Sequence, residues 1–257
     1  AEPIFVPGVW GPYFSAMGPG LWLNEGGQSS AGAAIEQTLS MHPAAPQARA
    51  MASGRGMSLP DMLAGMASEA IAGGRNAIDL AGPLIVVPDF LGNRSPLADP
   101  DARAVIAGLG MARDVDSLVA HYVAALIGIG YGLRQIVEAS RACGASIDRI
   151  ALSGGAGRHA LVRQMLADCT GIPVAVSRQP EPVLLGAAML GAAAAGAFSD
   201  LRSAMATMTG EADIFLPAPE TAQSHLRRFE AFETLQRTAR SLRAMTTQGD
   251  QHGQPAA

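Results

Sequence analysis

A glycine turn between a strand and a helix is the part of this sequence best suited to holding a ligand. The strand-like segment 147–152 is followed by Ser153-Gly154-Gly155, and 160–168 carry apolar side chains at helical spacing. Glycine accepts backbone angles that other residues avoid, and it lets a ligand approach backbone N–H groups. At the positive end of a helix these groups favour nucleotide phosphates, and an adenine ring is also able to lie flat on the glycines. The turn matches neither the dinucleotide fingerprint nor the P-loop pattern, so a turn that serves only helix–sheet packing stays equally open.

A second polar group, at 24–30, precedes an alanine-rich helix predicted at 31–41. The sequence Asn-Glu-Gly-Gly-Gln-Ser-Ser supplies one carboxylate, two glycines and several hydrogen-bonding side chains. Sugar hydroxyls need acceptors such as Glu25 and groups that both donate and accept, such as Gln28. Ser29 or Ser30 is also placed to cap the helix. The alternative is that Glu25 only caps or forms a salt bridge within the loop.

A third polar segment is the loop 88–100, which is rich in turn residues. It follows the apolar run 84–87, whose composition is that of a buried parallel strand. Loops at strand ends often carry function, so Asp89, Asn93 and Arg94 are candidates for lining a cleft. An arginine among Asp and Asn also commonly staples its own loop, and this alternative has equal weight.

Hydrophobic spacing predicts the elements that position these residues. We expect a β-hairpin from strands near 9–10 and 21–23, further strands at 84–87, 147–152 and 173–176, an extended link at 215–217, and helices at 31–41, 59–72, 114–143, 181–197, 200–208 and 220–245. The β-α-β-α order from Ile147 onward predicts parallel strands with helices on their faces, hence an α/β fold. The apolar run 186–198 is shorter than the roughly 20 residues that cross a bilayer, and it predicts a buried helix.

Composition limits the classes of partner. The net charge of −4 argues against a nucleic-acid footprint or a basic membrane-binding surface. The two cysteines, Cys143 and Cys169, have no metal-site spacing, and we expect a reduced, cytoplasmic setting. Residues 1–6 read as the end of a strand with no initiating Met, so we expect the chain to belong to a longer protein. We expect a main domain at 1–210, an amphipathic helical extension at 211–245 and a disordered tail at 246–257.

Four motifs carry a resemblance to a known family, because they occur together and in a fixed order. They are Phe5-Val-Pro-Gly-Val-Trp-Gly-Pro-Tyr-Phe14, the polar corner at 24–29, the loop at 88–97, and the turn at Gly154-Gly155. Together they resemble the C-terminal domain of FGGY carbohydrate kinases, most closely the D-ribulokinase branch. The resemblance covers nearly all of residues 1–245.

The resemblance implies an actin-like ATPase (ribonuclease-H-like) domain, with a mixed sheet flanked by helices. Such kinases pair two domains around a cleft and transfer the γ-phosphoryl group of ATP, with Mg²⁺, to a sugar hydroxyl. The implied partners are an N-terminal kinase domain, a ketopentose and, in a homodimer, a second copy; no nucleic acid and no membrane is implied.

Site residues follow from the same resemblance. Gly154, Gly155, Ala156 and His159 correspond to the adenine-binding turn, and Gly32 lies on a helix that approaches the nucleotide from the other side. Glu25, with Gln28 beside it, corresponds to a position that offers a carboxylate to sugar hydroxyls.

The sequence also departs from the family pattern. The catalytic Asp and both phosphate loops of the family lie upstream of the residue matching Ala1, so the resemblance assigns no catalytic residue to this chain. His159 stands where the family usually has Asn, and Leu91 stands where close relatives often have His.

Two hypotheses of different class follow. The chain is either the nucleotide-binding half of a pentulose kinase, inactive in isolation, or a non-catalytic nucleotide-binding or interaction module on the same scaffold. In both cases we expect exposed apolar surface around 9–23 and self-association of the isolated chain.

Overall fold

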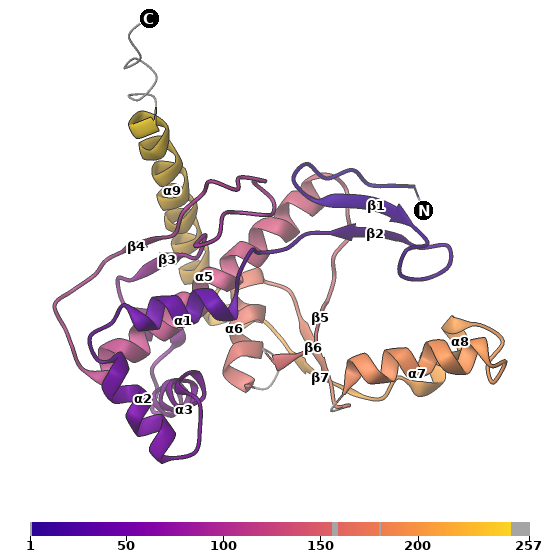
Figure 1. Cartoon of the computed structure of the whole chain (residues 1–257), viewed down its shortest axis with the longest axis horizontal. Helices are drawn as coiled ribbons and strands as arrows, with labels where there is room; N and C mark the ends of the chain where they lie inside the picture. The colour runs from indigo at the N-terminus through magenta and orange to yellow at the C-terminus, as the bar shows by residue number, and fades with distance from the viewer. Residues whose placement is uncertain (1, 156–158, 180, 248–257) are drawn as a thin grey trace, which may run out of the picture.

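The structure is a computed structural model that describes residues 2–155, 159–179 and 181–247 (Figure 1). Ala156 of the glycine turn and residues 248–257 of the predicted tail lie outside the described residues. The helices are α1 Gly32–Ser40, α2 Ala45–Gly54, α3 Leu59–Ala72, α4 Ala77–Ala81, α5 Val115–Ala142, α6 Ala160–Thr170, α7 Pro182–Ala194, α8 Leu201–Met208 and α9 Ala222–Thr247. The strands are β1 Trp10–Phe14, β2 Trp22–Glu25, β3 Ile85–Val87, β4 Val105–Ala107, β5 Ile150–Leu152, β6 Val174–Ser177 and β7 Ala212–Phe215.

Helix α5 is the centre of the core. It starts at Asp114, whose carboxylate accepts a hydrogen bond from the Ser117 amide at 2.8 Å. Helices α1, α3, α4 and α6 and strand β3 all pack on it. The helix is long and apolar enough to cross a membrane, but 67% of its apolar stretch is buried inside the protein. It is therefore the core helix of this domain.

Glycines in α5 allow the neighbouring elements to come close. A Cβ at Gly128 would lie 2.3 Å from the carbonyl oxygen of Val86 in β3. A Cβ at Gly130 would lie 2.7 Å from the Cβ of Cys169 in α6. Both glycines thus set the distance from α5 to the layers around it.

The strands form three small sheets. Strands β1 and β2 make the predicted hairpin, and β5 and β6 pair in parallel as predicted. Two expectations were wrong. Strand β3 was expected in a parallel sheet, but it pairs antiparallel with β4. Its apolar side chains are buried by α5 and α9, so the apolar run did not require parallel neighbours. The expected link at 215–217 begins inside β7, which pairs antiparallel with β6 and completes a mixed sheet.

Helix α9 packs its middle into the core. Phe229 and Phe232 are buried, and both contact the ring of Tyr131 from α5 edge-on. The predicted apolar stripe is only partly buried, since Leu226 and Leu242 are exposed. Helix α9 and β7 therefore share the core with the elements that precede them.

Helix α7 corrects another expectation, because it is not buried. Only Met189 of this apolar helix is buried, whereas Val183 is 76% exposed and Leu184 65% exposed. In the described part of the chain, α7 packs extensively only against α8, and the pair projects from the body of the domain (Figure 1). Apolar composition predicted burial, but none of the described helices and strands covers the outer face of α7.

The predicted cap of α1 is also absent. The helix begins after Ala31, and neither Ser29 nor Ser30 caps it with a side-chain hydrogen bond. The Ser30 hydroxyl is instead buried without a hydrogen-bond partner. The first amides of α1 are left without a side-chain acceptor.

Candidate functional site

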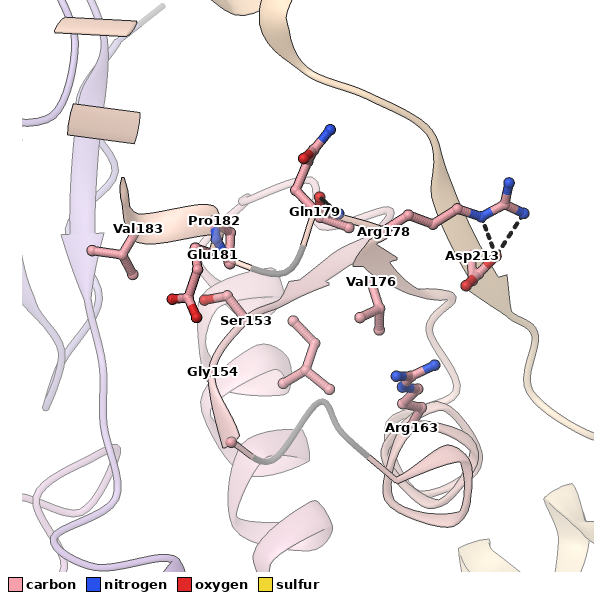
Figure 2. Close-up of a pocket in the computed structure, with 13 residues that line it drawn as sticks. Ser153, Gly154, Arg163, Val176, Arg178, Gln179, Glu181, Pro182, Val183 and Asp213 are labelled. Atoms are coloured by element: carbon pink, nitrogen blue, oxygen red, sulfur yellow. Dashed lines mark hydrogen bonds and ion pairs between the residues drawn. The ribbon is translucent and has the colours of Figure 1, made fainter. Parts of the chain in front are cut away.

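A pocket opens beyond the carboxyl ends of the parallel strands β5 and β6 (Figure 2). Its volume is about 480 Å³. The lining residues come from the ends of β5 and β6, the glycine turn, α6, the segment after β6, the start of α7, and β7: Leu152, Ser153, Gly154, Gly155, Arg163, Val176, Ser177, Arg178, Gln179, Glu181, Pro182, Val183 and Asp213. The carboxyl ends of parallel strands are the usual place for a ligand in an α/β fold.

The two glycines of the turn have different physical roles. Gly154 has a φ of +83°, a conformation that favours glycine. Gly155 has no positive φ, and a Cβ added to either glycine would meet no described atom within 4 Å. Packing against the helix or the sheet therefore does not explain Gly155, unlike Gly128 and Gly130 of α5. The φ of Gly154 fits the structural interpretation of the turn, and the position of both glycines in the lining of the pocket fits the ligand-binding one.

Charged side chains of both signs surround the pocket. Arg178 pairs with Asp213 at 2.8 Å and with Glu211, and it extends away from the other lining side chains (Figure 2). The guanidinium of Arg163 lies 5.4 Å from the ring centre of Phe215. Because the Arg178 pairs are exposed, they contribute little to stability and leave the mouth of the pocket polar.

His159 ends the glycine turn and is held by a residue from another helix. Its Nε2 lies 2.6 Å from Oδ1 of Asp61, in the first turn of α3. Hydrogen bonds from Ser58 and from His159 lower the pKa of Asp61 below its ordinary value. His159 therefore ties α6 to α3 and is not one of the residues that line the pocket.

Gly32 is the first residue of α1 and does not line the pocket either. It is exposed, and a Cβ there would meet no described atom within 4 Å. The structure thus brings Gly154 and Gly155 to one pocket, and it places His159 and Gly32 outside its lining.

The polar corner at 24–30 lies at the end of β2, separate from the pocket. Glu25 accepts a hydrogen bond from Arg94 at 3.0 Å, and the Arg94 guanidinium stacks 3.8 Å from the ring centre of Trp10. Arg94 therefore fastens the loop 88–100 to the hairpin, whereas the alternative weighed for it was a staple within its own loop. Glu25 forms a salt bridge, but its partner lies in the loop 88–100 and not in its own loop, and Glu25 remains exposed.

Gln28 attaches the corner to the central helix. Its Nε2 donates a hydrogen bond to the carbonyl oxygen of Ile129 at 2.9 Å. A Cβ at Gly132 would lie 2.5 Å from the Gln28 side-chain oxygen, so glycine at 132 makes room for this contact. The Gln28 amide is used for packing, and a role toward sugar hydroxyls stays a prediction.

Several lining residues of the pocket were missed from sequence. The parallel β5–β6 pair was predicted, and it places the segment after β6 beside the glycine turn, so Gln179 and Glu181 were within reach of that reasoning. Asp213 was not, because its position depends on β7, a strand that was not predicted and of which only Phe215 fell within the expected extended link.

The sequence is similar to those of known carbohydrate kinases. Residues 1–195 match the FGGY family of carbohydrate kinases, C-terminal domain. The chain is 42% identical over 234 residues to the FGGY carbohydrate kinase domain-containing protein of Homo sapiens, over 90% of this chain and 42% of that protein. It is 39% identical over 204 residues to D-ribulokinase YDR109C of Saccharomyces cerevisiae, over 78% of this chain and 28% of that protein.

Solved structures show the same fold. The xylulose kinase from Rhodospirillum rubrum has a TM-score of 0.68 at 22% identity, covering 88% of this chain and 41% of that chain. The fold is the predicted actin-like α/β fold of sugar kinases. The chain spans less than half the length of each of these relatives.

Proposed function

The chain belongs to the FGGY family of carbohydrate kinases, and from that premise we propose that it is the nucleotide-binding half of an ATP-dependent kinase whose substrate is a ketopentose such as D-ribulose. The observation that carries the proposal is the Gly154–Gly155 turn at the mouth of the pocket beyond β5 and β6. A Cβ at Gly155 would meet no described atom within 4 Å, so the backbone of the turn is accessible there to a ligand.

The residues around this pocket fit a nucleotide. Backbone N–H groups at the glycine turn and the side chains of Gln179 and Arg163 supply donors, and Glu181 supplies an acceptor. A cavity of about 480 Å³ with apolar walls from Val176, Pro182 and Val183 suits a flat base with its ribose. The glycine turn would then be the wall against which the adenine lies.

Magnesium is proposed to arrive with the nucleotide. The described residues contain no group of three or more His, Cys, Asp or Glu able to hold a metal ion. Mg²⁺ is commonly held through substrate phosphates and only one or two carboxylates. Its role in such a reaction is to neutralise charge on the transferring phosphoryl group.

The ketopentose is proposed from the relatives and from the polar corner. The yeast relative bears the name D-ribulokinase, and Glu25 offers an exposed carboxylate to sugar hydroxyls. We assign no catalytic residue to this chain, and we expect turnover to require the part that precedes this domain in the relatives.

That preceding part is the proposed partner of two apolar surfaces. Trp10, Phe14 and Met17 of the hairpin are exposed, as are Val183 and Leu184 of α7. The matched family is named as a C-terminal domain, which supports a further domain as the cover. Free Cys143 and Cys169 support a reduced, cytoplasmic setting as part of the same proposal.

Calorimetry with ADP tests the nucleotide half of this proposal. The wild-type chain should bind ADP, and Gly155→Val should weaken binding at least about tenfold by filling the space at the turn. Gly65→Val is the matched control, because Gly65 is an exposed glycine of α3 that does not line the pocket. Absence of ADP binding to the wild type, or equal binding by Gly155→Val, would overturn the assignment.

A non-catalytic nucleotide-binding or interaction module is the second candidate. The observation in its favour is that the polar residues assigned by resemblance are already engaged, His159 by Asp61, Glu25 by Arg94 and Gln28 by the Ile129 carbonyl oxygen. Turnover of D-ribulose by the protein together with its preceding domain separates the two, since the module would bind ADP without transfer.

A further inference from the structure

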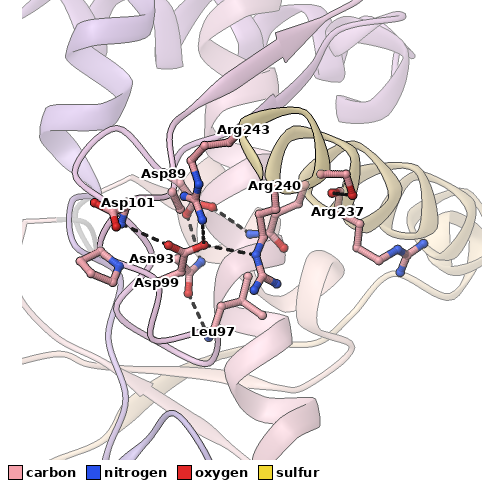
Figure 3. A network of polar contacts seen from close by, with 12 residues as sticks. Asp89, Asn93, Leu97, Asp99, Asp101, Arg237, Arg240 and Arg243 are labelled. Atoms are coloured by element: carbon pink, nitrogen blue, oxygen red, sulfur yellow. Dashed lines mark hydrogen bonds and ion pairs between the residues drawn. The ribbon is translucent and has the colours of Figure 1, made fainter. Parts of the chain in front are cut away.

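The loop 88–100 is bonded to both the C-terminal helix and the hairpin. Figure 3 shows its contacts with the C-terminal helix. We use the name relay loop for residues 88–100. Its three acidic and amide side chains, Asp89, Asn93 and Asp99, are all buried. Buried polar groups persist only where their hydrogen bonds are satisfied, so these contacts fix the conformation of the loop.

Helix α9 holds the relay loop from one side. Oδ2 of Asp99 accepts a hydrogen bond from the Arg243 guanidinium at 2.7 Å. The same oxygen forms an ion pair with Nε of Arg240 at 3.2 Å. Gln236 donates to the carboxylate of Asp89 at 2.9 Å. In Figure 3 both arginines reach from α9 toward Asp99. Two cations on one shielded carboxylate make this attachment stronger than an exposed pair.

The electrostatics agree with this geometry. The hydrogen bond from Arg243 lowers the pKa of Asp99 below its ordinary value. Burial raises the pKa of Asp89, although Gln236 and Asn93 donate hydrogen bonds to it. Asp99 is therefore the charged anchor of the relay loop, whereas Asp89 is held mainly by amides.

Hydrogen bonds within the relay loop connect Asp99, which α9 holds, to the residues next to Arg94. The backbones of Asn93 and Asp99 exchange two hydrogen bonds of 2.8 Å, forming an isolated bridge. Asn93 also donates to Asp89 at 3.1 Å and accepts from the Leu97 amide at 3.1 Å. Arg94 follows Asn93 directly, so its backbone is fixed by the pair that α9 anchors.

The other side of the relay loop holds the hairpin. Arg94 bonds Glu25 and stacks on Trp10, as described above. Ser95 donates to the carbonyl oxygen of Gly8 at 2.8 Å. A Cβ at Gly8 would lie 1.8 Å from the Pro96 carbonyl oxygen, so the two segments are in direct contact. The last turns of α9 thus connect through a single loop to the proposed sugar carboxylate.

We propose that Asp99, held by Arg240 and Arg243, is a positioning residue that sets the place of Glu25 through Arg94. Helix α9 then acts as a brace of the sugar corner, although it lies beyond the residues matched to the family domain. The part of this inference that concerns sugar rests on the proposed function. The mechanical coupling from α9 to the hairpin does not.

Hydrogen–deuterium exchange of the whole chain tests the coupling. Asp99→Asn keeps the size of the side chain and removes its charge, and it should raise amide exchange in β1 and β2 about tenfold. Arg237→Ala is the matched control, because Arg237 lies on the same helix and donates a hydrogen bond to Thr234 of that helix. It should leave exchange in the hairpin unchanged. Arg243→Lys retains the charge, so it should raise amide exchange in β1 and β2 less than Asp99→Asn does. It replaces Asp99→Asn in the test if that variant does not fold.

A spectroscopic signature separates positioning from loss of stability. In a Trp22→Phe background, Trp10 is the remaining tryptophan and reports its stacking with Arg94. Asp99→Asn should shift the Trp10 emission as Arg94→Ala does, and the double variant should shift it no further. Unchanged emission and hairpin exchange in Asp99→Asn, with opening confined to α9 and the relay loop, would overturn the proposal. Full additivity of the two substitutions would overturn it as well.

Ligand binding distinguishes this inference from the proposed function. With its preceding domain present, Asp99→Asn should weaken D-ribulose binding while ADP binding stays as in the wild type. If the wild type binds ADP but no ketopentose, the assignment of the sugar corner fails, and the exchange experiment still decides the coupling. If hairpin exchange responds but D-ribulose affinity does not, the positioning of Glu25 by Asp99 is refuted.

Discussion

The hydroxyl of Tyr131 lies 3.0 Å from Nδ1 of His225, joining the central helix to α9 inside the core. His225 is only 2% exposed, and its pKa is lowered to about 4 by burial and by the nearby Arg228 and Arg134. The folded state therefore holds a neutral imidazole in contact with a buried phenol. This relationship makes the stability of the domain depend on pH.

We predict acid destabilisation between about pH 6.5 and pH 4. Because the folded pKa of His225 lies below the unfolded value of 6.5, its neutral form stabilises the fold above pH 6.5, and this contribution is lost as pH falls. The loss reaches up to about 3 kcal/mol below pH 4, at 1.36 kcal/mol per pKa unit. Burial and the neighbouring His121 also lower the pKa of His42, so protonation of His42 adds to the loss of stability as pH falls.

Urea unfolding at several pH values measures this effect. His225→Gln should be less stable than the wild type at neutral pH and should lose less stability on acidification. Parallel slopes for the wild type and His225→Gln would show that His225 is not the titrating group.

Most of the helices were predictable because their signals are local, but α2 and α4 were not predicted. Capping residues such as Asp114 and Asp200, and apolar spacing such as that of α3, depend only on nearby sequence. The pairing of β3 with β4 and of β7 with β6 depends on contacts distant in sequence, and the spacing of apolar residues does not encode a partner. The same limit explains α7, whose composition predicts burial but not which element covers it.

Substitution of the α5 glycines should be costly. Gly128→Ala places a Cβ 2.3 Å from the backbone of Val86, so β3 must shift, and we expect a loss of roughly 1–3 kcal/mol, as for overpacked cores. Gly65→Ala in α3 meets no atom and should stabilise the protein by about 0.5–1 kcal/mol through helix propensity. Chemical denaturation compares the two. A neutral Gly128→Ala would mean that β3 does not pack on α5 as described.

Self-association of the isolated chain should depend on α7. Val183 and Leu184 form an exposed apolar pair on a helix that α8 covers only in part. Light scattering should show oligomers for the wild type, and Leu184→Lys should shift the chain toward monomer. Leu109→Lys removes a similarly exposed leucine of the 108–113 loop and should leave the oligomers in place. A monodisperse wild-type monomer would contradict the prediction.

Only part of the candidate site was predictable from the sequence. The Gly154–Gly155 turn was found because glycine between a strand and a helix is a local signal. A salt bridge of Glu25 was one of two open alternatives, but Arg94 was not identified as its partner, since 69 residues separate the pair and only the fold brings them together. The bond from His159 to Asp61 spans 98 residues and had no signal in the sequence.

The pair His159–Asp61 gives the last prediction, which concerns the adenine side of the site. His159 stands where the family resemblance implies Asn, and its Nε2 is held by Asp61 at 2.6 Å instead of facing the pocket. His159→Asn shortens the side chain and releases it from Asp61, so the amide becomes available at the start of α6. We therefore expect His159→Asn to bind ADP several-fold more tightly than the wild type, because a neutral amide both donates and accepts. Both His159 and Asp61 are partly exposed, so loss of the pair should change stability by less than about 1 kcal/mol. Calorimetry with ADP measures the affinity, and Asp61→Asn is the control that weakens the pair without changing residue 159. Weaker ADP binding by His159→Asn than by Asp61→Asn would show that the imidazole itself contacts the nucleotide.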